Sequence, residues 1–351
     1  MLTPSQYKTI LNHLQADYTL FEQHGETYPL TVFRPAPNQI NDVDSCLGDF
    51  SAEFLRRDQF AIYDESHLDS LHQDGRTLTN GESFVLDQLE TVERDGQLRI
   101  HGKLGNYFDM LATCDALDHE LRRLGLSDKA DLPHRTQFHQ HVTPQAMFYT
   151  SDGRCPIIGA ATLLIFNHEG VYKAIVVQRS SNMATGAGLY HVMPAFVFQP
   201  SEPEAFYRHE WSMKHQIMRE FGEELFGMPE YADWDNPQGY DYFYNHPAII
   251  DLQAMLNDKR ASMHFSGIAY NLLSLRAEIC SLLIIHDPDW YSRSQDALQK
   301  AINTERQKTV YIPIDDDEAI LSILPENPPR HFAPQGAATL WLGLELAREL
   351  L

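Results

Sequence analysis

One segment, residues 203–226, constrains the fold more than any other part of the sequence. It reads PEAFYRHEWSMKHQIMREFGEELF, and at about 100° per residue it can form one amphipathic helix. With Glu220 taken as zero, Glu223 falls at roughly −60° and Glu224 at roughly +40° around the helix axis. The apolar side chains fall on the opposite side: Tyr207, Trp211, Met218, Phe221 and Leu225. We therefore predict a helix with one buried face and one acidic face.

The three carboxylates of the acidic face indicate a metal site. Side chains at positions i, i+3 and i+4 are neighbours on a helix, so like charges there repel. A Glu-Glu pair alone is typical of a solvent-exposed helix. The full string, Arg219 to Glu224, is expected by chance only on the order of once per thousand chains of this length. A divalent cation relieves the repulsion, and Mg²⁺ and Mn²⁺ prefer oxygen ligands. We expect Arg219 to pair with Glu223 and orient it.

The rest of the chain predicts a mixed α/β (α+β) protein of two domains, because 351 residues are about twice a usual domain length. Residues 157–166 and 171–180 read as a buried β-hairpin. In the first half, a helix after Pro4, a hairpin over 84–104 and a helix ending at Gly125 are expected. The polar stretch 126–152, with Pro133 and Pro144, is predicted to be a linker or a partly extended arm between the two halves. The domains are then 1–150 and 151–351.

Net charge excludes one class of partner. Lys and Arg number 27 and Asp and Glu number 49, which gives −22 with histidine neutral. A field of that sign repels nucleic acid, but a small phosphate ester can bind through a divalent cation. We find no apolar run long enough to span a membrane, and no signal or transit peptide pattern. We therefore expect a cytoplasmic protein that binds neither nucleic acid nor membrane.

Cysteine and histidine spacing does not indicate a zinc site. The four cysteines lie far apart and are expected to be buried thiols: Cys46, Cys114, Cys155 and Cys280. The histidines His134, His139 and His141 fall in the predicted linker. A solvated linker accounts for them more simply than a metal site does.

The string Arg219-Glu220-Phe221-Gly222-Glu223-Glu224 resembles the R-E-U-x-E-E centre of the Nudix box. The preceding strands, the second ending VVQRS at 176–180, also resemble that family, as do residues 276–286, 309–324 and the C-terminal helix. The resemblance covers about 155–351, with an insertion near 228–262, and implies an α/β/α sandwich with a mixed sheet. The chain is also similar to bacterial proteins in which an unassigned N-terminal domain, here the smaller α/β unit 1–150, precedes such a domain.

The resemblance implies a role for each matching residue. Glu220, Glu223 and Glu224 would be the metal ligands and Arg219 the arginine that supports them; Glu223 or Glu224 would act as base. The backbone carbonyl of Ala195 would be a further ligand. The turn Pro194-Ala195-Phe196 lacks the two glycines that the family has there, Glu210 lies one residue from the family's upstream glutamate, and Gly227 lies one place late. Arg179 and Tyr190 are weaker candidates for contact with phosphate and base.

The activity implied is hydrolysis of a diphosphate linkage in a nucleoside diphosphate derivative with Mg²⁺ or Mn²⁺. The alternative is a sensor of the same fold that binds a nucleotide or sugar nucleotide without turnover. Loss of the turn glycines favours the sensor, whereas three retained glutamates favour the enzyme. A DNA-binding regulator is opposed by the net charge. The sequence leaves the substrate, the metal and the oligomeric state open, a homodimer included.

Overall fold

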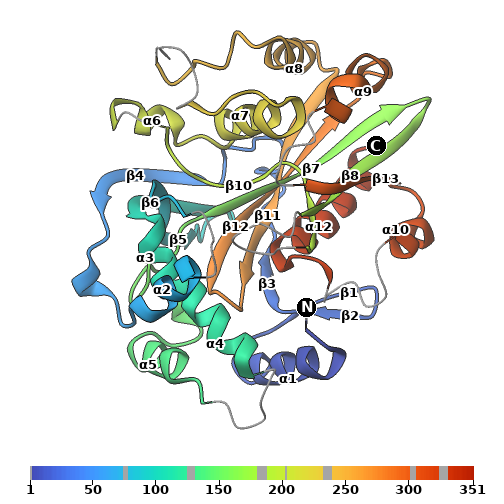
Figure 1. The fold of residues 1–351 in the computed structure, drawn as a ribbon. Coiled ribbons are helices and arrows are strands. Elements are labelled where there is room, and N and C mark those ends of the chain that lie inside the picture. The colour runs from blue at the N-terminus through green and yellow to red at the C-terminus, as the bar shows by residue number, and fades with distance from the viewer. Residues whose placement is uncertain are drawn as a thin grey trace.

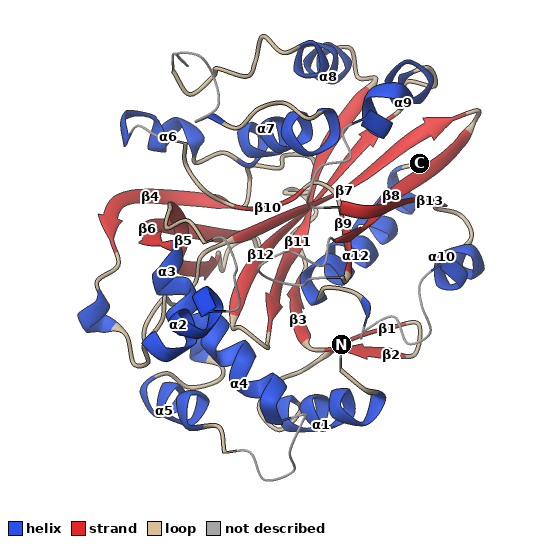
Figure 2. Ribbon diagram, in the orientation of Figure 1, coloured by secondary structure: helices blue, strands red, loops and turns tan. Residues whose placement is uncertain are grey.

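The computed structural model describes residues 2–73, 78–124, 131–179, 188–201, 204–231, 239–300, 306–323 and 331–351. Over these residues the chain is a mixed α/β protein, as the sequence predicts (Figures 1 and 2). None of the helices in the described part of the chain combines the length and the apolar character that a membrane span requires.

A large mixed sheet organises the second half of the chain. Its described strands, in spatial order, are β13 (Arg306–Pro313), β8 (Val171–Arg179), β7 (Gly159–His168), β12 (Arg276–Ile285), β11 (Ala261–Asn271) and β3 (Leu30–Phe33). Two short strands add to it: β9 (Tyr190–Val192) pairs with β8, and β10 (Ala195–Val197) pairs with β7. The pair β7 and β12 is parallel, and the other pairs are antiparallel. The predicted β7–β8 hairpin is confirmed.

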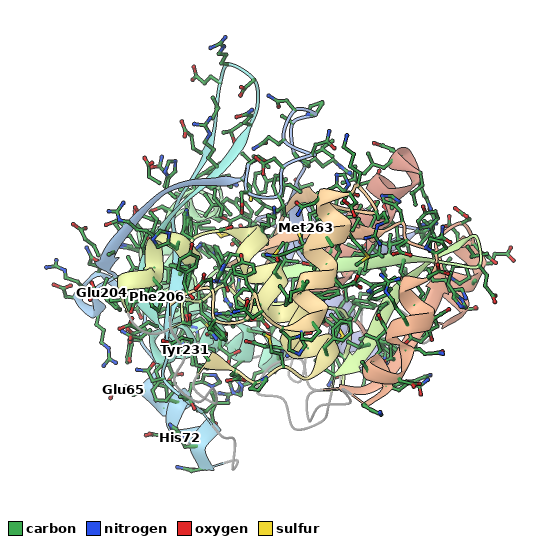
Figure 3. All side chains as sticks on the ribbon, turned by 90° about the horizontal axis from the view of Figure 1, so that it is seen from above. Glu65, His72, Glu204, Phe206, Tyr231 and Met263 are labelled. Atoms are coloured by element: carbon green, nitrogen blue, oxygen red, sulfur yellow. The ribbon has the colours of Figure 1, made fainter. Side chains whose placement is uncertain are left out.

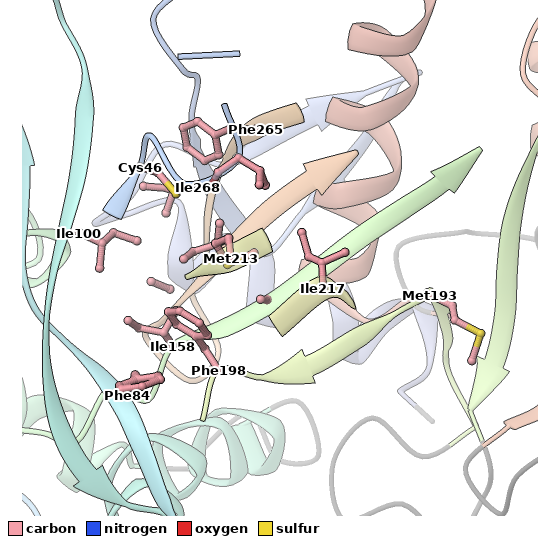
Figure 4. Close-up of a cluster of buried hydrophobic side chains, with 14 of the residues drawn as sticks. Cys46, Phe84, Ile100, Ile158, Met193, Phe198, Met213, Ile217, Phe265 and Ile268 are labelled. Atoms are coloured by element: carbon pink, nitrogen blue, oxygen red, sulfur yellow. Dashed lines mark hydrogen bonds between the residues drawn. The ribbon is translucent and has the colours of Figure 1, made fainter. Parts of the chain in front are cut away.

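Helices cover both faces of this sheet (Figure 1). On one face lies α12 (Pro334–Leu350), which contacts β7, β11 and β12. The other face carries α7 (Met213–Phe226), α8 (Pro247–Asn257) and α9 (Trp290–Lys300), with α8 touching β11 and α9 touching β7. Figure 4 shows Met213 and Ile217 of α7 beside Ile158 and Phe198 in the apolar layer beneath the helix. The short helix α10 (Asp317–Ile323) follows β13.

The first half builds a smaller sheet in the order β4, β6, β5. The bounds of its elements are α1 (Pro4–Leu14), β1 (Phe21–Gln23), β2 (Glu26–Tyr28), β4 (Leu47–Phe54), α2 (Glu65–Gln73), β5 (Glu82–Thr91), β6 (Leu98–Asn106), α3 (Tyr107–Met110), α4 (Ala116–Leu124) and α5 (Pro133–His141). A single π-helical turn, Leu111–Asp115, joins α3 to α4. The predicted N-terminal helix, the β5–β6 hairpin and the longer helix are confirmed, while the expected helix end at Gly125 lies outside the described residues.

The described part of the stretch predicted to be a linker or extended arm, 126–152, contains a helix and packs against the rest of the chain. Residues 133–141 form α5, in which Phe138 is buried, and a 3₁₀ turn follows at Ala146–Phe148. Two buried arginines hold this segment to the turn between β11 and β12. Arg154 donates to the carbonyls of Leu275 and Met147 at 3.0 and 2.7 Å. Arg135 donates to the two carbonyls at 272 and 273. These carbonyl contacts do not follow any periodic pattern, so a scan for helical or strand spacing cannot detect them.

Contacts also cross the boundary predicted near residue 150. Strand β3 belongs to the first half, yet it pairs with β11 of the large sheet. One apolar cluster contains Ile10 and Leu117 as well as Phe221 and Phe265. The division into 1–150 and 151–351 as two folding units stays a prediction, and the structure shows that the halves share both a sheet and a core.

The four cysteines are buried free thiols, as predicted. The three histidines predicted to be in a linker lie instead on α5. The ring of His139 contacts the hydroxyl of Tyr18 at 2.9 Å, and His134 lies 3.7 Å from a carboxylate oxygen of Glu120. These histidines are not surrounded by solvent, because α5 packs against α4.

We predict that Arg154→Met lowers the free energy of unfolding by about 3 kcal/mol, because it leaves buried carbonyls without donors. Arg154 is fully buried, and its guanidinium lies 5.3 Å from the centre of the Phe138 ring. Urea unfolding followed by fluorescence measures the change. The control is Arg56→Met, at a side chain that is 70% exposed. Equal effects of the two substitutions would show that the carbonyl contacts of Arg154 do not stabilise the fold.

Candidate functional site

The acidic residues lie on α7, which is shorter than the sequence predicts. Residues 204–206 form a 3₁₀ turn and Tyr207–Glu210 form the separate helix α6. The chain then turns at Trp211, and α7 begins after Ser212, whose hydroxyl accepts from the amide of His215 at 3.2 Å. The prediction of one helix from residue 203 is therefore wrong. Tyr207 and Trp211 are apolar contacts outside α7, whereas Met218, Phe221 and Leu225 form its buried face as predicted.

The first half of the chain holds the start of α7. The Asp44 carboxylate accepts from the Ser212 hydroxyl at 3.0 Å and from the amide of Lys214 at 3.1 Å. The Trp211 indole donates to the carbonyl of Gly48 at 3.0 Å. The Trp211 ring lies so close to Gly102 that a Cβ at that position would overlap it. A carboxylate at a helix N-terminus accepts hydrogen bonds from the free amides there, and its negative charge interacts favourably with the helix dipole. Asp44 therefore fixes where α7 begins.

Arg219 is a buried cation on α7, with 5% of the side chain exposed. One terminal nitrogen, Nη2, donates to Gln216 Oε1 at 2.7 Å and to Glu220 Oε1 at 3.0 Å. Its Nε lies 4.0 Å from Glu223 Oε1 and has no hydrogen-bond partner among the described residues. The sequence predicts pairing with Glu223. In the structure the shorter contact of Arg219 is with Glu220, the next residue, because the guanidinium also donates to Gln216.

Glu223 lies between Arg219 and a tyrosine from outside the helix. The hydroxyl of Tyr242 donates to Glu223 Oε1 at 3.2 Å. Burial raises the pKa of Glu223, and the neighbouring carboxylate of Glu220 adds to the rise; Arg219 opposes both, and the pKa is about 8. In the metal-free protein this carboxyl therefore gives up its proton less readily than an exposed glutamate does.

Glu224 faces β10. Its Oε1 accepts from the backbone amide of Ala195 at 3.2 Å. In a strand, the N–H and C=O of one residue point to the same edge, so the Ala195 carbonyl points toward the Glu224 side as well. Neither Ala195 nor Phe196 has a positive φ. Glycine is therefore not required for this backbone path, and its absence does not prevent the contact.

The structure brings the predicted residues together only in part. The guanidinium of Arg219 lies within 4.0 Å of Glu220 and of Glu223, while Glu224 is held by β10. Within the described ranges, no group of three His, Cys, Asp or Glu side chains is placed closely enough to hold a metal ion. The donor set has the right chemistry for Mg²⁺ or Mn²⁺, since all three side chains offer oxygen. The three carboxylates do not form a preformed cluster.

The weaker candidates, Arg179 and Tyr190, come from strands β8 and β9. Tyr190 is 8% exposed and belongs to the apolar cluster on the α12 face, where its ring stacks on Phe332 at 6.3 Å. Packing alone accounts for this tyrosine. Arg179 ends β8, and its Nε is buried with no hydrogen-bond partner in the described structure. Its contact with a substrate stays a prediction.

Glu278 is a buried acid that sequence reasoning missed. Its carboxylate lies over Gly159, so close that a Cβ at that position would overlap it. Burial raises its pKa to about 8, against the opposing charges of Arg276 and Arg179. Nothing in the string RAEICSLLIIH distinguishes this glutamate from a solvent-facing strand residue.

Sequence reasoning also missed Gln216, Asp44 and Tyr242. Gln216 could have been found, because a residue three positions before Arg219 is its neighbour on a helix. Asp44 and Tyr242 reach α7 from distant parts of the chain, and no local pattern marks such contacts. Glu210 is buried and accepts from the backbone amide of Ser201 at 3.0 Å, so it anchors the turn before α7.

Comparison with known proteins adds no family assignment. No protein-family model matches the sequence, and a search of curated proteins finds no significant match. The resemblance to the Nudix family therefore rests on the residues named above.

We predict that Glu223 and Glu278 contribute stability to the metal-free protein that is lost as pH rises from about 4.5 to 8. Buried histidines such as His191 and His215, whose pKa values are lowered to about 3, act in the opposite direction below pH 6.5, so the comparison of wild type with variant isolates the glutamates. A carboxyl whose folded pKa is raised stabilises the fold fully below its unfolded pKa, and this contribution disappears as pH rises through the folded pKa. Glu223 and Glu278 both have a pKa near 8, so both act in this direction.

Urea unfolding at several pH values in the presence of chelator measures this loss. Glu223→Gln should reduce the slope of stability against pH without abolishing it, because Glu278 remains. Glu53→Gln, at an exposed position, is the control and should leave the slope unchanged. A Glu223→Gln slope equal to that of wild type would contradict the raised pKa.

Proposed function

We propose that the chain is a metal-dependent hydrolase of the Nudix type that cleaves a diphosphate linkage in a nucleoside diphosphate derivative. The observation that carries this proposal is the environment of the buried Arg219. Its guanidinium donates to Gln216 and to Glu220, and it lies 4.0 Å from Glu223. A helix that needed only a solvent-exposed acidic face has no physical reason to bury a guanidinium beneath it. The arrangement instead holds carboxylates at defined positions next to β10.

The three glutamates fit a Mg²⁺ or Mn²⁺ ion by donor chemistry, since hard cations take carboxylate oxygens. Glu220, Glu223 and Glu224 would hold it, with the Ala195 carbonyl as a further oxygen on the Glu224 side. When bound, such an ion offsets charge on phosphate oxygens and activates water.

The chain's own residues have separate tasks in this proposal. Arg219 orients Glu220 and limits the repulsion among the carboxylates, while β10 holds Glu224 through the Ala195 amide. The pKa of Glu223 is raised in the metal-free protein. Cation binding favours the deprotonated carboxylate, so metal affinity should rise with pH. Glu223 or Glu224 would act as base for the attacking water.

A nucleotide or sugar-nucleotide sensor is the second candidate. It is favoured by one observation, the attachment of α7 to the first half of the chain through Asp44 and Trp211. Ligand binding at the acidic face would then change contacts with β4 and β6. The enzyme remains our proposal because a binding module gains nothing from three adjacent carboxylates.

We predict that Glu220→Gln, Glu223→Gln and Glu224→Gln each reduce metal-dependent hydrolysis by at least about 100-fold, because each removes a charged oxygen ligand. A screen of nucleoside diphosphate derivatives with Mg²⁺ and Mn²⁺, read by chromatography of the products, identifies the substrate first. Arg219→Ala should reduce both turnover and thermal stability, since it leaves buried carboxylates without their partner.

The control is Glu53→Gln, at an exposed position on β4, which should keep most of the activity. Metal should also raise the melting temperature of wild type more than that of the three variants. Saturable nucleotide binding with no product from any derivative would favour the sensor. If metal raises the melting temperature of wild type and of all three variants equally, both the enzyme and the sensor at the acidic face are excluded.

A further inference from the structure

The segment Gly239–His246, which we call the tyrosine segment, runs along α7 before α8 begins. Its tyrosines contact two different turns of the helix: Tyr242 reaches Glu223, and the hydroxyl of Tyr244 lies 3.3 Å from His215 Nδ1. Between them, Phe243 is fully buried and its ring lies 5.0 Å from that of His215. The tyrosine segment is thus anchored in the core while its two hydroxyls reach polar groups of α7.

Tyr242 is itself held firmly. It is 7% exposed, and its ring contacts Tyr231 at 4.9 Å and Phe243 at 5.2 Å. Tyr231, labelled in Figure 3, comes from the chain just after α7. A ring packed on two sides cannot easily change its rotamer. The Tyr242 hydroxyl is therefore placed at Glu223 by packing and does not depend on the carboxylate to hold it there.

The two groups that approach Glu223 converge on the same oxygen. Tyr242 donates to Oε1 at 3.2 Å, and Arg219 Nε lies 4.0 Å from Oε1. No described residue donates to Oε2 of Glu223. The side chain keeps 15% of its surface exposed. Tyr242 thus holds one oxygen, and the other has no hydrogen-bond donor among the residues that the structure describes.

We propose that Tyr242 is a positioning residue of the acidic face: its hydroxyl holds Oε1 of Glu223 so that Oε2 is presented to a divalent cation. The proposal rests on the proposed function, because it assumes that α7 binds such a cation. It gives a role to the part of the chain between α7 and β11, which resembles nothing in the family pattern. Substitution of a residue that hydrogen-bonds to a metal ligand typically lowers metal affinity by about 10- to 100-fold.

The experiment is a titration of the full-length, metal-free protein with Mn²⁺, in which free Mn²⁺ is measured by electron paramagnetic resonance. Tyr242→Phe should raise the Mn²⁺ dissociation constant about tenfold. Tyr244→Phe is the matched control, since it removes a hydroxyl from the same segment that contacts His215 instead of Glu223. Its dissociation constant should stay close to that of wild type. Both variants keep their aromatic rings, so the apolar contacts persist.

Each outcome decides one point. If wild type binds Mn²⁺ and Tyr242→Phe binds it equally well, the positioning role is overturned while the metal site stands. If both variants lose affinity equally, looser packing of the tyrosine segment explains the loss and the hydroxyl has no specific role. If wild type does not bind Mn²⁺, the proposed function fails and the role of Tyr242 fails with it.

A second measurement tests the route through Glu223 without metal. In the presence of chelator, the effects of Tyr242→Phe and Glu223→Leu on the urea midpoint should be non-additive, because each removes one partner of the same hydrogen bond. Tyr244→Phe with Glu223→Leu should be additive. Additive effects of Tyr242→Phe and Glu223→Leu would show that the hydroxyl does not act through this carboxyl, even where Mn²⁺ binding is weakened.

Discussion

The buried guanidinium of Arg219 is the constraint on which the acidic face depends. A charge removed from water is costly unless nearby groups compensate it. Gln216 and Glu220 accept hydrogen bonds from the guanidinium, and the carboxyl of Glu223 lies 4.0 Å away. This requirement fixes the side of α7 on which the carboxylates lie. Burial has a second effect, because it leaves Glu223 with a raised pKa despite the nearby positive charge.

The position of α7 depends on residues far away in the sequence. Asp44 and the Gly48 carbonyl come from the first half of the chain, and Tyr242 comes from the segment before α8. Figures 1 and 2 show α7 between these parts, above the large sheet. The first half is therefore more than an appended domain. It caps the helix that carries the candidate site and binds the indole next to that helix.

The sequence predicts the parts of the fold and site that have a local pattern. The β7–β8 hairpin has two apolar runs around a turn at Gly170, which has the positive φ that such turns need. The acidic face follows from i, i+3 and i+4 spacing. The helix start is predicted at residue 203, whereas α7 begins at Met213, because apolar spacing continues backward past the Ser212 cap. The contacts of Arg154 and Tyr242 have no local pattern, since their partners come close only in the tertiary structure.

The most direct test of the central claim is a crystal structure of the full chain soaked in Mn²⁺, with anomalous diffraction recorded at the manganese absorption edge. We expect an anomalous peak within coordination distance of carboxylate oxygens from at least two of Glu220, Glu223 and Glu224. We also expect the Arg219 to Glu220 contact to persist. An acidic face without manganese, in crystals whose soak contained it in excess, would contradict the claim that α7 binds a divalent cation.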